Sequence, residues 1–190
     1  IWIPRPLFGT FDGKDHKIYN FVVDTKQEGH PDQKYACFIT YNYGLLKNLI
    51  IGSKDGETYD GKSMFLHDPQ ANDGAWAYVG LVGKVSGTKN QAEESVVGKI
   101  QNVKNFAKLI IPEGTSKIKF AVGGIASMLE ATGATVEGCV NYGDIEVLNT
   151  GEPAAKSCVI GGLVGKFDYE GSIINCENRG DITNEHLGVW

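Results

Sequence analysis

The chain contains 190 residues, 42% of them hydrophobic, and carries a formal net charge of -5 at pH 7. This length and apolar content predict one domain with a single core over residues 1–190. The acidic balance argues against a nucleic-acid partner, because phosphate backbones are bound by clustered cations, and no apolar run approaches the ~20 residues that span a bilayer.

Short apolar phrases bounded by glycine or asparagine run along the first third of the chain. They read FGTFDG at 8–13, IYNF at 18–21, CFI at 37–39 and LKNL at 46–49. Phrases of this length, rich in β-branched and aromatic residues, predict strands and not helices.

A long insertion is expected next, over residues 52–76, where the pattern of short phrases breaks. It contains GETYDGKS at 56–63, which matches the phosphate-binding pattern G-x-x-x-x-G-K-[ST]. A phosphate-binding loop requires a helix directly after it, but Pro69 leaves room for barely one turn. We therefore predict a solvent-exposed loop and no nucleotide partner.

The segment from 35 to 78 is rich in aromatic residues interleaved with Asp and Asn. Exposed aromatic residues in such a setting are typical of a carbohydrate or protein contact surface. The alternative is that half of them fill the core beneath the loop. The candidate ligand-binding residues are Tyr59, Phe65, Trp76 and Tyr78.

Two longer phrases recur in the rest of the chain, where helical turns are expected only at 91–95 and 126–131. The first phrase reads VGLVGKV at 79–85, VGGIASM at 122–128 and IGGLVGKF at 160–167. A second phrase follows each time, and its last two copies read CVNYGDI and CENRGDI, 37 positions apart. A period of about forty residues, made of short strands and glycine turns, predicts a solenoid.

We therefore predict an all-β fold, a single-stranded parallel β-helix (solenoid) that is right-handed and has about four to five irregular coils. Equivalent residues of successive coils would stack ~4.8 Å apart. The expected inward columns are Leu81, Ile125 and Leu163, with Phe38 before them; Ile100, Val136 and Ile173; and Val103, Cys139 and Cys176. One corner is expected at Asn105, Asn141 and Asn178, with a left-handed backbone and amide hydrogen bonds along the column.

The recurring phrases resemble the glycine-rich GLUG-type repeats of bacterial surface proteins, especially those of gut Bacteroides and the non-catalytic regions of IgA-cleaving peptidases. The opening FGTFDG at 8–13, followed by KIYNF at 17–21, is similar to the F-x-G-x-[FL]-D-G…I-x-N-[FL] entry that commonly precedes such repeats. The resemblance covers residues 6–183, and the insertion at 52–76 departs from it. It implies a parallel β-helix on a secreted or surface-anchored protein, usually without assigned chemistry.

Two aspartates occupy equivalent positions in the last two copies of the second phrase. Asp144 and Asp181 would lie ~4.8 Å apart, and Lys108 has the equivalent position one coil earlier. A carboxylate pair at ~5 Å is the geometry of a retaining glycosidase and could also bind calcium. The alternative is a Gly-Asp turn whose charge lies in water and discourages edge pairing. No cofactor is expected, apart from the possibility of calcium at this pair.

The cysteines lack the spacing of a zinc site, and the histidines are scattered and predict no catalytic arrangement. Cys139 and Cys176 would stack within disulfide distance, but side chains that project in parallel fit the disulfide dihedral poorly. Free buried thiols are the favoured interpretation, and the redox state stays open.

We expect a non-catalytic, adhesin-like binding or spacer module that is extracellular or at a bacterial cell surface. Its partner would be a glycan or a surface protein. Whether the chain is an enzyme is uncertain, and the alternative is a polysaccharide-degrading β-helix enzyme, a lyase or glycosidase, that uses the face of Asp144 and Asp181. The abrupt start and end of the chain are typical of a module from a longer protein, so flanking domains or end-to-end contacts are expected.

Overall fold

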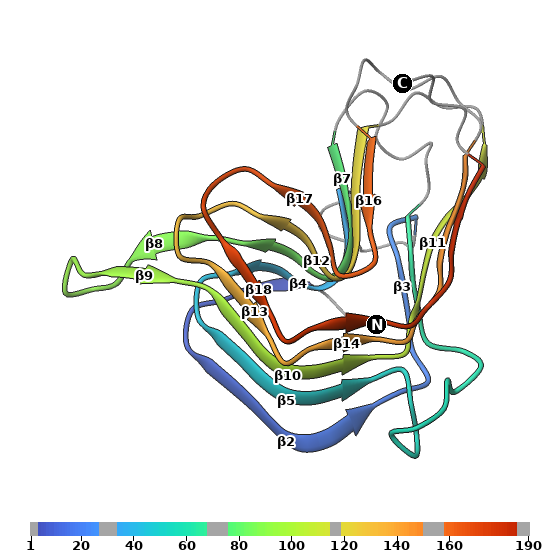
Figure 1. Cartoon of the computed structure of the whole chain (residues 1–190), viewed down its shortest axis with the longest axis horizontal. Helices are drawn as coiled ribbons and strands as arrows, with labels where there is room; N and C mark the ends of the chain where they lie inside the picture. Colours follow the sequence, from blue (N-terminus) through green and yellow to red (C-terminus); the bar gives the residue numbers. More distant parts are fainter. Residues whose placement is uncertain (1–3, 27–33, 68–75, 115–118, 150–157, 186–190) are drawn as a thin grey trace.

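The computed structural model describes residues 4–26, 34–67, 76–114, 119–149 and 158–185. Over these residues the chain is all-β and contains no helix. The strands form three sheets of parallel strands, named sheets A, B and C, together with one short antiparallel hairpin (Figure 1).

The sheets are defined by their strands. Sheet A consists of β1 (Arg5–Leu7), β4 (Tyr35–Asn42), β7 (Trp76–Val85), β12 (Lys119–Leu129), β16 (Cys158–Gly161) and β17 (Val164–Phe167). Sheet B consists of β2 (Thr10–Ile18), β5 (Leu45–Ile51), β10 (Lys99–Asn105), β13 (Thr135–Glu137), β14 (Val140–Asn141), β18 (Ser172–Ile174) and β19 (Glu177–Asn178). Sheet C consists of β3 (Val22–Asp24), β6 (Met64–Leu66), β11 (Lys108–Gly114), β15 (Ile145–Asn149) and β20 (Ile182–Asn184). The hairpin consists of β8 (Gly87–Lys89) and β9 (Ser95–Val97).

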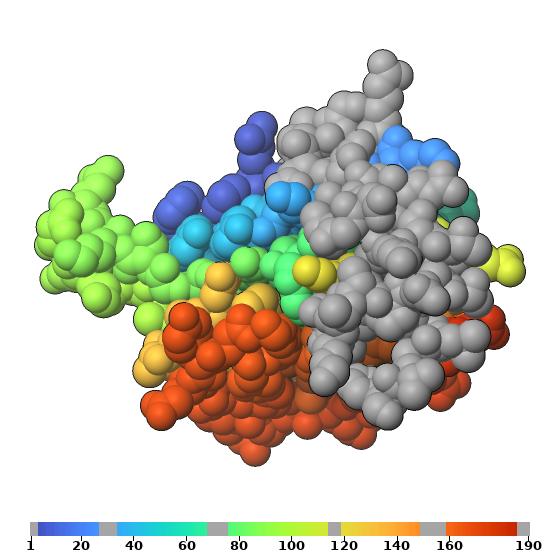
Figure 2. Space-filling view, turned by 90° about the horizontal axis from the view of Figure 1, so that it is seen from above, coloured from blue at the N-terminus to red at the C-terminus, as the bar shows by residue number. Residues whose placement is uncertain are grey.

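The chain passes from sheet A to sheet B to sheet C and then returns to sheet A. Each passage is called a layer, and sheet C holds five strands, one from each of layers 1 to 5. Figure 2 shows the colours running from blue to red across the molecule, so the layers lie in sequence order. Strands of adjacent layers pair in parallel. The predicted all-β class with stacked parallel strands is confirmed, and the arrangement is compatible with a parallel β-helix.

The core consists of columns of equivalent residues, as the repeats predicted. In sheet B, Ile100 pairs with Leu46 and Val136, and the column ends at Phe11 and Ile173. Its three inner members are fully buried, whereas Phe11 is 38% exposed and Ile173 is 39% exposed. Each layer therefore buries the side chains of its neighbours, and the outermost of the described layers lack this cover on one side.

The first phrase of the repeat forms the matching column in sheet A. Phe38 lies opposite Leu81, as expected. The next layer contains a β-bulge, because Gly124 and Ile125 together occupy the place of Leu81 and shift the register before Ala126. The bulge bends the strand while keeping Ile125 in the core, where it is fully buried.

The asparagine corner is present, but the prediction of a left-handed backbone at Asn105, Asn141 and Asn178 is wrong. Asn105 Nδ2 donates to Asn141 Oδ1 (2.9 Å), and Asn141 Nδ2 donates to Asn178 Oδ1 (2.8 Å). The corner is closed by the asparagine side chains, since the N–H of Ala107 donates to Asn105 Oδ1 (3.1 Å). A column of left-handed residues lies elsewhere, inside sheet B, and its members have φ between 52° and 62°: Asn48, Asn102, Gly138 and Asn175.

Neither segment that was expected to hold a helical turn is helical. Residues 126–129 belong to β12, which pairs with β7 and β17. Residues 91–95 lie at the end of the hairpin, which protrudes from the stack of layers (Figure 1, Figure 2). The Asn90 side chain closes the hairpin by accepting the N–H groups of Ala92 and Glu94. Strand pairing and turn hydrogen bonds thus outweigh local helix preference.

The insertion is shorter than residues 52–76. β6 pairs with β3 and β11 in sheet C, and β7 begins at Trp76. The described insertion is therefore residues 52–63, which connect β5 to β6. In layer 3 the equivalent connection, between β10 and β11, consists of residues 106–107 alone. Residues 68–75, part of the expected insertion, lie outside the described residues.

Candidate ligand-binding surface

The strands of sheet A bend sharply toward their outer face (Figure 1). Tyr35 and Tyr41 both belong to β4 and are six positions apart, which in a straight strand corresponds to about 20 Å. Their hydroxyl oxygens nevertheless lie 2.6 Å apart and share a hydrogen bond. The packing at this bend is tight, because a Cβ at Gly83 of the next strand would lie 2.7 Å from the Tyr35 ring.

Six aromatic rings are in continuous contact across this bend, and we call them the aromatic row. The ring-centroid distances are 6.3 Å for Trp76–Tyr78, 5.0 Å for Tyr78–Tyr35, 5.5 Å for Tyr35–Tyr41, 5.7 Å for Tyr41–Tyr43 and 5.1 Å for Tyr43–Phe8. The middle of the row is buried, with Tyr35 at 4% and Tyr78 at 8% exposure, whereas Phe8 is 67% exposed. Trp76, Tyr41 and Tyr43 are half-buried. The rings at the two ends of the row are thus the accessible ones.

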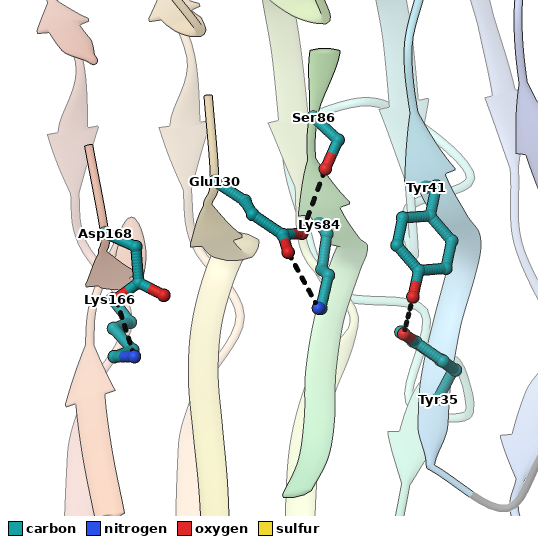
Figure 3. A network of polar contacts seen from close by, with 7 residues as sticks. All are labelled: Tyr35, Tyr41, Lys84, Ser86, Glu130, Lys166 and Asp168. Carbon is teal, nitrogen blue, oxygen red and sulfur yellow. Dashed lines mark hydrogen bonds and ion pairs between the residues drawn. The ribbon is translucent and has the colours of Figure 1, made fainter. Parts of the chain in front are cut away.

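A lysine from layer 3 lies over the middle of the aromatic row. Lys84 Nζ is 4.8 Å from the ring centroid of Tyr78 and 5.5 Å from that of Tyr41, within cation–π range. The same ammonium pairs with Glu130 Oε1 at 3.2 Å, and Ser86 Oγ donates to the other carboxylate oxygen (Figure 3). Burial acts to lower the pKa of Lys84, but the neighbouring Tyr78 and Glu130 raise it above its ordinary value.

A second lysine, from layer 5, covers the Trp76 end of the row. Lys166 Nζ lies 5.0 Å from the Trp76 ring centroid and 2.6 Å from Asp168 Oδ1 (Figure 3). Both lysines are therefore neutralised by a nearby carboxylate. Glu130 directly follows β12, which pairs with the strand of Lys84, and Asp168 lies two residues after Lys166. The surface offers aromatic ring edges and the exposed ring of Phe8, bordered by charge-balanced polar groups, which suit apolar contact together with hydrogen bonding to hydroxyl groups.

The predicted ligand-binding residues fall in three different places. Trp76 and Tyr78 belong to the aromatic row. Phe65 is fully buried in the core, where its ring lies 5.4 Å from that of Phe21, so it has no surface for a ligand. Tyr59 lies on the loop 52–63, half-buried, and is not part of the row. As the sequence left open, some of these aromatic residues fill the core.

The loop 52–63 is organised by its own carboxylates. The N–H groups of Glu57 and Thr58 both donate to Asp55 Oδ1 at 2.8 Å. The N–H groups of Lys62 and Ser63 donate to Asp60 Oδ1 at 2.8 and 2.7 Å. In a phosphate-binding loop such amides converge on phosphate oxygens. Here they bind carboxylates of the same loop, which explains why GETYDGKS folds as a structural loop.

Asp60 also joins the loop to layer 1. Its second oxygen accepts the N–H of Asn20 at 2.6 Å, and Ser63 Oγ in turn lies 3.4 Å from the N–H of Phe21. Burial acts to raise the pKa of Asp60, but the hydrogen bonds from Ser63, Asn20 and Lys62 outweigh it, so the pKa lies below its ordinary value. The ionised carboxylate therefore stabilises this corner.

The column of Lys108, Asp144 and Asp181 is present in the predicted register. Lys108 Nζ lies 2.8 Å from Glu146 Oε1 and 3.4 Å from Asp144 Oδ2, and the N–H of Asp181 donates to Asp144 Oδ1 at 3.2 Å. Among the described residues there is no group of three or more His, Cys, Asp or Glu side chains arranged to hold a metal. Calcium binding by Asp144 and Asp181 stays a prediction.

The sequence interpretation missed Phe8, Lys84 and Lys166 as members of this surface. A signal for the two lysines existed, because each follows the glycine of V-G-K in the first repeated phrase. Both pair in register with Met128, which places them in one column of sheet A. Phe8 is equivalent to Tyr43 one layer later, since Leu7 pairs with Asn42 and Thr10 with Leu45, so an aromatic residue followed by glycine at both positions was its signal.

Comparisons with known proteins give one structural likeness to report. No family model and no curated protein sequence matches the chain. The crystal structure of a candidate immunoglobulin A1 protease from Bacteroides ovatus is 18% identical, with a TM-score of 0.43; the match covers 88% of this chain and 59% of that one, less than two thirds of its length. Within the described residues, no helix could cross a membrane.

Proposed function

We propose that the chain is a non-catalytic binding module, built as a right-handed parallel β-helix, that presents the outer face of sheet A to a carbohydrate. The observation that carries the proposal is the aromatic row with its two covering lysines. Four of the five neighbouring ring pairs stack face to face, with interplanar angles of 2–17°, so a sugar ring can contact the edges of the row and the exposed terminal ring of Phe8. The accessible ends of the row, Phe8 with Tyr43 and Trp76, would make the first contacts.

Charge balance favours an uncharged carbohydrate over an acidic one. Lys84 is paired with Glu130, and Lys166 with Asp168, so neither ammonium is available as an isolated charge for a carboxylate or sulfate. These ion pairs can still hydrogen-bond hydroxyl groups through their remaining donor and acceptor positions. A neutral sugar therefore fits both the apolar and the polar parts of the surface.

The setting of the module follows from the repeat resemblance and is part of the same proposal. GLUG-type repeats imply an extracellular or cell-surface location, with flanking domains in the parent protein. In that setting the layers would act as a rigid scaffold that holds the aromatic row away from the neighbouring domains. A surface protein is the alternative partner for the same face, because aromatic side chains are also enriched in protein interfaces.

Glycan-array screening, followed by calorimetric titration with the sugars that bind, tests the proposal. Trp76→Ala and Tyr43→Ala should each weaken binding by roughly tenfold or more, the equivalent of about 1.4 kcal/mol. Tyr169→Ala is the matched control, because Tyr169 is 62% exposed and lies outside the aromatic row. Equal losses in all three variants, or binding that survives both row substitutions, would contradict the assignment of this face.

The same experiment separates a binding module from a polysaccharide-degrading enzyme. Asp144→Asn/Asp181→Asn should leave sugar binding unchanged, because these residues belong to the sheet C column and not to sheet A. Release of new reducing ends or unsaturated sugars by the native chain, and its loss in this double variant, would favour the enzyme instead.

A further inference from the structure

Two cysteines of adjacent layers are in direct contact. Cys139 and Cys176 lie between paired residues of sheet B, since Val136 pairs with Ile173 and Val140 with Glu177. The N–H of Cys139 donates to Cys176 Sγ at 3.3 Å. In-register parallel strands place paired Cα atoms ~4.8 Å apart, which lies within the ~4.4–6.8 Å range of disulfides.

The two thiols have different surroundings. Cys139 is fully buried between layers 3 and 5. Cys176 is half-buried in layer 5, where its neighbours Ile173 and Ile174 are 39% and 41% exposed. Reagents can therefore approach Cys176 from solvent, while Cys139 is reached only through Cys176 or by opening of the layer.

The contact between the two thiols also shifts their pKa values in opposite directions. The hydrogen bond with Cys176, and then burial, raise the pKa of Cys139. The pKa of Cys176 is lowered instead. The thiol and the backbone N–H of Cys139 both donate to Cys176 Sγ and so stabilise its thiolate. An accessible thiol that receives N–H donors is the reactive kind of cysteine, and a buried thiol in contact with it is placed to resolve an adduct.

We propose that Cys176 is a modification site for small-molecule disulfides, and that Cys139 resolves the adduct into a disulfide between layers 4 and 5. The Cys176 thiolate attacks one sulfur of the reagent, its S–S bond breaks, and one thiol leaves with the proton given up by Cys176. Cys139 then loses its proton, its sulfur attacks Cys176 Sγ, and the second thiol leaves. Two cysteines are oxidised, and one small-molecule disulfide is reduced to two thiols.

Closure requires one side-chain rotation. Cys139 Sγ now lies 3.3 Å from the carbonyl oxygen of Glu137 in its own layer and 3.8 Å from that of Ile100 in layer 3. Rotation about its Cα–Cβ bond would turn it toward layer 5 and break only weak S–H contacts. The product would tie layer 5, the outermost of the described layers on this side, to the core. This inference is independent of the carbohydrate proposal.

The test treats the native chain with oxidised glutathione, stops the reaction with acid and alkylating agent, and maps the cysteines by mass spectrometry. The expected product contains a peptide pair in which Cys139 is linked to Cys176, with a mass lower by two hydrogen atoms than that of the two reduced peptides. Cys139→Ala should accumulate glutathione on Cys176, and Cys176→Ala should leave Cys139 unmodified while the fold is intact by circular dichroism. Cys37, fully buried beside the aromatic row, is the internal control and should react far more slowly.

Three results would overturn the inference. The first is a glutathione adduct on Cys176 that persists in the native chain without a cross-link. The second is a reaction of Cys37 as fast as that of Cys176. The third is no reaction at Cys176 at all. If both variants failed to fold, the product of the native chain would decide alone, because the linked peptide is diagnostic.

Discussion

Gly124 in sheet A packs directly against the side-chain amide of Asn141 at the corner of sheets B and C, so that a Cβ on Gly124 would lie 2.2 Å from Asn141 Cγ. The same relationship recurs one layer later, where a Cβ on Gly162 would lie 2.3 Å from Asn178 Cγ. The glycine of the first repeated phrase and the asparagine of the second are thus two halves of one contact within a layer. The absence of a side chain at the glycine leaves room for the amide that closes the corner.

A first prediction follows from this contact. Gly124→Ala should destabilise the fold by about 1–3 kcal/mol, because the added methyl group overpacks the space of the Asn141 amide. Chemical denaturation measures the free energy of unfolding. Gly9→Ala is the control, since no atom lies within 4 Å of a Cβ at Gly9. Combining Gly124→Ala with Asn141→Ala should cost less than the sum of the two single changes; additive losses would contradict the contact.

A second prediction concerns the asparagine ladder itself. Asn141→Ala removes the bonds from Asn105 and to Asn178 and Gly143, and should cost about 3 kcal/mol at ~1 kcal/mol per bond. Asn178→Ala, at the exposed end of the ladder, removes the bonds from Asn141 and to Gly180 but should cost about 1 kcal/mol or less, because water can replace them. Equal losses at the two positions, measured by urea unfolding, would show that ladder position and burial have no effect.

A third prediction tests the bend of sheet A. Tyr35→Phe removes the buried hydroxyl that bonds to Tyr41 and should cost about 0.5–1.5 kcal/mol in the free energy of unfolding. Tyr19→Phe is the matched control, because Tyr19 is 44% exposed, and it should change stability by less than about 0.5 kcal/mol. If the bend also positions the aromatic row, Tyr35→Phe should weaken sugar binding; a purely stabilising hydroxyl would leave affinity unchanged.

A fourth prediction concerns pH and the loop 52–63. The pKa of Asp60 is lower in the folded chain than its ordinary value. Its stabilisation is therefore present above the unfolded pKa, near ~3.9, and is lost as the pH falls through the folded pKa. Asp60→Asn should cost about 1 kcal/mol at pH 7, since solvent screens this partly exposed group, and progressively less in acid.

Unfolding of both chains in urea between pH 7 and pH 2 measures the effect. A gap between native and Asp60→Asn that stays constant over this range would contradict the role of the ionised carboxylate. Lys62→Ala is the control within the loop, because Lys62 is exposed. Its free energy of unfolding should equal that of the native chain at every pH.

The local patterns of the sequence were sufficient for the strands of the repeated phrases and for their register, but not for β6, which lies within the expected insertion, or for residues 126–129 of β12, which were expected to be helical. Copies of one phrase, such as those containing Asn141 and Asn178, pair in register in adjacent layers. Aligning the copies therefore predicts which residues pair, because equivalent residues of a repeat occupy equivalent positions in the stack. The inward column of Ile100, Val136 and Ile173 could be predicted for the same reason.

The sequence by itself thus determined the all-β class, the columns and the asparagine ladder. The tertiary structure decided the features that depend on where a strand bends or an irregular segment packs. The bend of β4 joins Tyr35 to Tyr41, the carboxylates of Asp55 and Asp60 take up the amides of a false phosphate-binding loop, and Lys166 reaches Trp76 across two layers. None of these contacts follows the repeat period. Each depends on side-chain reach and local backbone geometry, which no alignment of a chain with itself contains.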